Sequence, residues 1–211
     1  MLRVNSAWLS AGAGAAALAG LLFAEARGRA AARAVAKTAA SLGFVGVALA
    51  LGVRGAYGRW MLAGLVLSVA GDLFLLSKEK APFLAGLVAF LLAHLAYAAA
   101  FLPVSHPSPG VLLALLATGA LVLRLLWPHL GSMRPAVSAY TAVITFMLWL
   151  ALGVHRGEVA AGALLFYASD LLVARGAFVA PGKANQFVGW PLYYAGQYLL
   201  ALSLGGDPPL G

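Results

Sequence analysis

Long apolar stretches alternate with short polar connectors along the whole chain. Each stretch is close to the roughly 20 residues that a helix needs to cross the hydrocarbon core of a bilayer. The connectors are short and rich in proline and glycine, which favours antiparallel neighbours over inserted soluble domains. The predicted spans are residues 6–24, 34–53, 60–77, 83–102, 110–127, 135–153, 158–175 and 190–205.

This pattern predicts an all-α fold. We expect a polytopic membrane protein in which about eight transmembrane helices form one bundle, with residues 1–211 as a single transmembrane helical domain. The first stretch has a second interpretation as a signal peptide, because Arg3 precedes it and Ala24-Glu25-Ala26 resembles a small-residue cleavage site.

Composition supports a membrane protein and excludes a soluble globular one. Hydrophobic residues make up 63% of the chain and charged residues 9%, against roughly a quarter charged in soluble domains. The absence of cysteine removes disulfides and thiolate catalysis. The net charge of +8 comes from basic residues scattered at helix ends, which is typical of contact with anionic headgroups rather than with nucleic acid. The bilayer is therefore the expected partner, and the oligomeric state stays open.

The distribution of basic residues between alternate connectors predicts the orientation. The odd-numbered connectors carry nine, against four for the N-terminus and the even-numbered connectors, so the positive-inside rule places the odd connectors in the cytoplasm and both termini outside. We expect a multi-pass protein of a bacterial-type inner membrane. The nine are Arg27, Arg29, Arg33, Lys78, Lys80, Arg124, Arg134, Arg175 and Lys183, and the four are Arg3, Arg54, Arg59 and Arg156.

Two aspartates lie inside predicted spans. Asp72 and Asp170 each sit near the cytoplasmic end of a span, so we expect them at matched depth. An ionisable group in hydrocarbon costs several kcal/mol, which makes each acid a candidate functional residue and the other its natural partner. An offset of 98 residues aligns the two segments and predicts a parallel repeat of four spans plus four. Carboxylates that face each other across a polar pocket are the expected geometry.

Other polar side chains lie at similar depth within the spans. Each also has a structural interpretation: Lys37 can snorkel to the headgroups or pair with a carboxylate, His94 can be a packing residue, and tyrosines near span ends can form an interfacial belt. These residues are Lys37, His94, Tyr97, Tyr140, Tyr193, Tyr194 and Gln197. Histidine spacing does not predict a metal site, and no serine-hydrolase elbow or phosphate loop is present, so no cofactor is expected.

Four motifs resemble the YhhN family of eight-span membrane proteins, whose animal members are lysoplasmalogenases. The resemblance runs from about residue 37 to 203, with Lys37-Thr38 standing where Lys-Pro is expected. The motifs are Gly71-Asp72, then Phe83-x-x-Gly86-Leu87-x-x-Phe90-x-x-x-His94-x-x-Tyr97, then Gly162-Ala163-Leu164-Leu165-Phe166-x-x-Ser169-Asp170, and finally Tyr193-Tyr194-x-x-Gln197-Tyr198-Leu199.

The resemblance implies an enzyme that hydrolyses the sn-1 vinyl ether of a lysoplasmalogen to a fatty aldehyde and a glycerophospho-ethanolamine or -choline. The substrate would be a lysophospholipid or another single-chain ether lipid. Vinyl ether hydrolysis needs a proton donor and an anion that stabilises an oxocarbenium ion, and two carboxyl groups can divide these roles. Asp72 and Asp170 would be catalytic, in an assignment that the sequence leaves open.

The remaining candidates would bind substrate in the cytoplasmic leaflet. His94, Tyr194 and Gln197 would orient water or the ether oxygen. Lys37 or Arg134 would hold the phosphate, with Tyr97, Tyr140 and Tyr193 nearby. Two alternatives remain: a proton-coupled transporter or lipid-binding protein that uses the same aspartate pair, and a hydrolase of ester or amide lysolipids.

Overall fold

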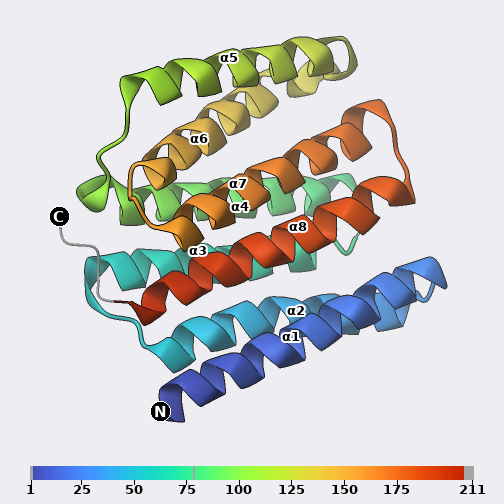
Figure 1. Cartoon of the computed structure of the whole chain (residues 1–211). Coiled ribbons are helices and arrows are strands. Elements are labelled where there is room, and N and C mark those ends of the chain that lie inside the picture. The colour runs from blue at the N-terminus through green and yellow to red at the C-terminus, as the bar shows by residue number, and fades with distance from the viewer. Residues whose placement is uncertain (1, 78, 207–211) are drawn as a thin grey trace.

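Helices form nearly all of the protein (Figure 1). The computed structural model describes residues 2–77 and 79–206, so Lys78 lies outside the described residues. No strand occurs in these two ranges, and each α-helix overlaps one predicted span, which confirms the all-α prediction. The α-helices are α1 (Leu2–Ala26), α2 (Ala30–Leu51), α3 (Gly55–Phe74), α4 (Lys80–Phe101), α5 (Pro109–Leu126), α6 (Arg134–Leu152), α7 (Gly157–Ala174) and α8 (Lys183–Leu202).

The bundle has the surface of a membrane protein. Six of the helices are long and apolar enough to cross a bilayer, namely α1, α2, α4, α5, α6 and α7. Large side chains such as Leu9, Val35 and Leu113 are 75%, 71% and 69% exposed, which suits lipid rather than water. The other two helices, α3 and α8, carry polar groups that neighbouring helices cover. The protein is therefore an integral membrane protein.

Consecutive helices alternate in direction and pack as hairpins (Figure 1). The pairs α1–α2, α3–α4 and α7–α8 make the closest contacts, while α1 and α5 lie at opposite edges. Four connectors, after α1, α3, α5 and α7, therefore gather at one end of the bundle, which we call the odd-connector end. Because α3 and α7 run toward this end, Asp72 and Asp170 both lie in its half of the bundle.

Small residues allow α3 and α4 to approach closely. A Cβ atom at Gly64 would collide with the ring of Tyr97, and one at Gly71 would lie 2.7 Å from Phe90 Cε2. These small residues on α3 thus receive aromatic side chains of α4. This packing fixes the rotation of α3 and turns Asp72 into the interior.

The connection from α7 to α8 departs from regular helix. After Ala174 the chain forms a π-helical turn, η4 (Arg175–Val179), before α8 begins. Turns of this kind are rare and often occur at functional sites. Residues of η4 lie five to nine positions after Asp170, which places the turn on the odd-connector side of this aspartate.

Candidate functional site

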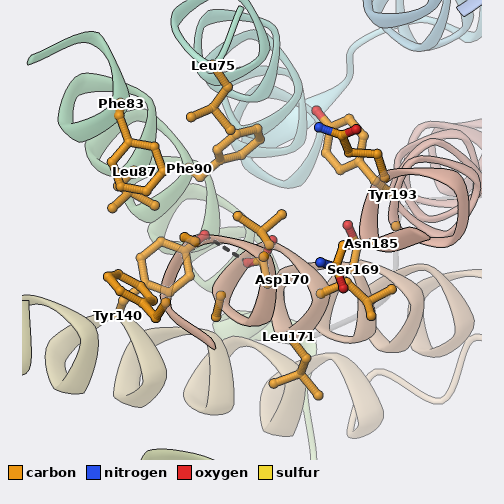
Figure 2. Close-up of a pocket in the computed structure, with 18 of the residues that line it drawn as sticks. Leu75, Phe83, Leu87, Phe90, Tyr140, Ser169, Asp170, Leu171, Asn185 and Tyr193 are labelled. Atoms are coloured by element: carbon orange, nitrogen blue, oxygen red, sulfur yellow. Dashed lines mark hydrogen bonds between the residues drawn. The ribbon is translucent and has the colours of Figure 1, made fainter. Parts of the chain in front are cut away.

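A cavity of about 630 Å³ is lined by residues of all the helices from α2 to α8 and contains both aspartates in its wall. Most of its lining is apolar, and Figure 2 shows Phe83, Leu87 and Phe90 forming the wall contributed by α4. The cavity extends to the odd-connector end, where exposed Pro181 and Gly182 line it. Its size suits a small-molecule ligand, for which about 300–1,000 Å³ is usual.

Asp72 is the centre of a fully paired polar cluster. Its Oδ1 lies 3.0 Å from Lys37 Nζ, and its Oδ2 accepts hydrogen bonds from Ser41 Oγ and Tyr193 OH, both at 2.7 Å. The side chains of Lys37 and Asp72 are only 6% and 4% exposed. Lys37 Nζ also lies 6.0 Å from the centre of the Trp190 ring. An ammonium and two hydroxyl donors therefore complement a carboxylate at this position.

Asp170 has a different environment. Its Oδ2 accepts a hydrogen bond of 2.8 Å from Tyr140 OH, drawn as a dashed line in Figure 2, and lies 3.5 Å from His94 Nε2. Its side chain is 11% exposed, and His94 is its only partner among the ion pairs of the described residues. The two aspartates share the cavity but belong to separate hydrogen-bonding clusters.

The His94 ring is held so that one nitrogen faces Asp170. Nδ1 lies 2.7 Å from the carbonyl oxygen of Phe90, which requires a proton on Nδ1, and the ring stacks on Phe166 with centroids 4.3 Å apart. In the neutral imidazole Nε2 then carries a lone pair, and this nitrogen is buried without a hydrogen-bond partner. A lone pair and a carboxylate oxygen repel each other, so a proton on either atom would make this contact favourable.

A third polar cluster lies behind the Asp72 cluster. Tyr97 OH donates to Gln197 Oε1 at 2.6 Å, and Gln197 Nε2 donates to Ser68 Oγ at 3.2 Å. Tyr194 OH lies 3.2 Å from both Ser41 Oγ and the Lys37 carbonyl oxygen. These side chains are almost fully buried and hold α2, α3, α4 and α8 in register.

The predicted site residues thus fall into three groups, which lie in the cavity wall, behind the wall, and away from the cavity. The cavity wall contains Lys37, Asp72, Tyr140, Asp170 and Tyr193. Four others, His94, Tyr97, Tyr194 and Gln197, are buried behind the wall rather than in it.

Arg134 is not brought to the cavity. It begins α6 at the odd-connector end, and its guanidinium lies 4.9 Å from the centre of the Trp127 ring. Lys37 is at the cavity but is occupied by Asp72. Neither of the two cations expected to hold a phosphate is therefore free at the entrance to do so.

Sequence reasoning missed two residues, Ser41, which bonds to Asp72, and Asn185, which lines the cavity. Ser41 lies one helical turn after Lys37, and this spacing of four placed both on one face of α2, a signal that was available. Asn185, which is 7% exposed and lines the cavity, stands before the predicted start of the last span and carried no such signal. Within the described ranges, no three histidine, aspartate or glutamate side chains gather as metal ligands.

The fold and the site define a polytopic helical membrane protein with a buried, mostly apolar cavity that holds two carboxyl groups. The chain belongs to the YhhN family, whose model matches residues 32–204. This confirms the resemblance seen in the four sequence motifs.

Curated relatives carry the name lysoplasmalogenase. Lysoplasmalogenase TMEM86A of Bos taurus is 35% identical over 156 residues, which cover 68% of this chain and 64% of that protein. Lysoplasmalogenase TMEM86B of Sus scrofa is 35% identical, with coverage of 76% and 70%. The lysoplasmalogenase of Mycobacterium tuberculosis is 34% identical, with coverage of 67% and 59%. The chain thus spans about two thirds of these relatives' length, and no solved structure matches it.

Proposed function

We propose that this protein is a membrane hydrolase that cleaves the sn-1 vinyl ether of lysoplasmalogens. The observation that carries the proposal is that two carboxyl groups with different partners line one mostly apolar cavity. The names of the relatives point to the same substrate class. An apolar cavity of about 630 Å³ offers room for a single lipid chain beside the reacting bond.

The different partners support a division of roles. Asp72 faces the Lys37 ammonium and two hydroxyl donors, which suits a carboxylate that stabilises a cation. Asp170 has no such cation, and the lone pair on His94 favours a protonated carboxyl opposite it. We therefore assign Asp170 as the general acid and Asp72 as the stabilising anion.

With these roles, the two aspartates can carry out every proton transfer of the catalytic cycle. Asp170 gives its proton to the β-carbon of the vinyl ether, and the oxocarbenium ion that results faces Asp72. Water adds to the cation as Asp72 takes its proton, which forms a hemiacetal. The hemiacetal collapses as Asp170 takes the hydroxyl proton and Asp72 returns a proton to the leaving glycerol oxygen. The products are a fatty aldehyde and a glycerophospho-ethanolamine or -choline, and both aspartates recover their starting states.

The cavity would receive substrate from the cytoplasmic leaflet. Its entrance lies at the odd-connector end, and the excess of basic residues in the odd connectors favours a cytoplasmic position for this end, with both termini outside. The expected residence is an inner membrane of bacterial type.

The test is aldehyde release from a 1-alkenyl lysophospholipid by the purified protein, followed by mass spectrometry. Asp72→Asn and Asp170→Asn are each expected to lower turnover about 100-fold or more. Glu158→Gln, at the far end of α7, is the control and should retain activity. If both aspartate variants hydrolyse the substrate at the rate of the unsubstituted protein, the proposed mechanism is wrong. Transport of lipid without aldehyde would instead support a transporter.

A further inference from the structure

The phosphate of the proposed substrate needs a cationic partner at the entrance of the cavity. Lys37 lies deep in the wall, paired with Asp72 at 3.0 Å, and Arg134 lies over Trp127. A negatively charged headgroup in a low-dielectric entrance is costly without a donor that carries positive charge. A cation other than Lys37 and Arg134 must therefore bind the phosphate.

Arg175 is not itself part of the cavity wall, but its neighbours place it beside the entrance. It is the first residue of η4, and the next three residues of this turn, 176–178, line the cavity. Its Nη1 donates a hydrogen bond of 2.6 Å to Asn185 Oδ1. Asn185 is itself a buried part of the cavity wall, and its Nδ2 donates to the Ala180 carbonyl at 2.8 Å.

The two hydrogen bonds of Asn185 orient Arg175 across the connection from α7 to α8. The amide is committed on both sides, to the guanidinium and to the backbone of the connector. One Nη1 donor of the guanidinium is used in this way, and the Arg175 residue is exposed, so its planar fork is available to an anion.

The distance along α7 matches the substrate. Arg175 follows Asp170 by five residues, which is an axial rise of about 7.5 Å and a rotation of about 140° around α7. In a lysoplasmalogen five bonds separate the ether oxygen from the phosphorus, which is about 6 Å for bonds of about 1.5 Å in an extended zigzag. A phosphate at the level of Arg175 would therefore leave the vinyl ether at about the depth of Asp170, and the long Arg175 side chain would have to span the rotation between them.

We propose that Arg175, positioned by Asn185, binds the phosphate of the single-chain glycerophospholipid and sets the depth of its ether bond. This inference rests on the proposed function for the identity of the substrate. The bound chemistry is a phosphodiester at the cavity entrance, which belongs to the substrate rather than to the surrounding bilayer.

A binding experiment tests the inference separately from catalysis. The probes are a non-cleavable 1-O-alkyl glycerophosphocholine and the matching 1-O-alkylglycerol, which lacks the phosphate, each titrated into the purified full chain in detergent. Arg175→Gln should weaken binding of the phospholipid roughly 10- to 100-fold and leave the alkylglycerol unchanged. Asn185→Ala should give a smaller loss with the same selectivity, and Arg175→Lys should recover part of the affinity.

Control variants identify the source of any effect. Arg124→Gln removes an exposed cation at the same end of the bundle, on α5, and should bind both probes normally. Equal losses for both probes in Arg175→Gln would indicate a structural or bilayer-anchoring role and would overturn the inference. So would a phospholipid-selective loss in Arg134→Gln with none in Arg175→Gln. Absence of aldehyde release with selective binding intact would refute the proposed function alone.

Discussion

The buried pair of Lys37 and Asp72 offers a quantitative test of the structure. Each side chain is at most 6% exposed, and the charged atoms are 3.0 Å apart. Lys37→Met leaves the carboxylate with only the Ser41 and Tyr193 hydroxyls, and Asp72→Asn leaves the ammonium beside the Trp190 ring. Each single substitution therefore strands one buried charge, whereas the double variant removes both.

The magnitude follows from burial. Removing one partner of a buried ion pair costs about 3–5 kcal/mol, while replacing both partners with neutral groups is often nearly neutral. Both single variants of the Lys37–Asp72 pair should thus lose about 3–5 kcal/mol of unfolding free energy. The double variant should come within about 2 kcal/mol of the unsubstituted protein, because no uncompensated charge remains. An exposed pair would give only about 0–1 kcal/mol.

The assay is thermal unfolding of the four purified proteins in one detergent, followed by tryptophan fluorescence. For a chain of this size about 1 kcal/mol corresponds to roughly 2–4 °C, so each single variant should unfold at least about 6 °C lower. Glu158→Gln breaks a pair with Arg156 in which both side chains are more than a fifth exposed, and should shift the midpoint much less.

The double variant decides the outcome. If it is destabilised by the sum of the two single losses, the side chains do not interact as the structure shows. If Lys37→Met alone is as stable as the unsubstituted protein, the Lys37 ammonium contacts the lipid headgroups and not the Asp72 carboxylate. The assignment of Asp72 as a charge-balanced anion would then lose its basis.

Two further predictions concern the packing around the site and the second aspartate. Gly64→Leu should destabilise the bundle by about 1–3 kcal/mol or more in the same unfolding assay, because the new side chain would collide with the Tyr97 ring. The control is Gly12→Leu, since no atom lies within 4 Å of a Cβ at this position. An equal effect at both positions would contradict the packing of α3 on α4. Tyr140→Phe removes the hydroxyl that donates to Asp170. It should lower the steady-state rate of aldehyde release about tenfold and change the unfolding midpoint little. An unchanged rate would show that Tyr140 takes no part in catalysis.

The candidate acids were recognisable because their signal is local. Asp72 and Asp170 each interrupt an apolar run, and the penalty for placing a carboxyl group in hydrocarbon does not depend on which helices surround it. The partners were less accessible. Whether Lys37 reaches a headgroup or a carboxylate depends on how α2 is rotated against α3, and hydropathy does not encode that rotation.

The apolar pattern by itself determined the all-helical class, the approximate helix ends and the membrane setting, since length and hydrophobicity act within each segment. Tertiary structure alone decided that Asp72 and Asp170 line one cavity yet form separate clusters, and that Arg175 bonds to Asn185 of the cavity wall while Arg134 packs on Trp127. These outcomes depend on close contacts between helices, such as Gly64 against Tyr97, which rotate each polar side chain toward one neighbour and away from another.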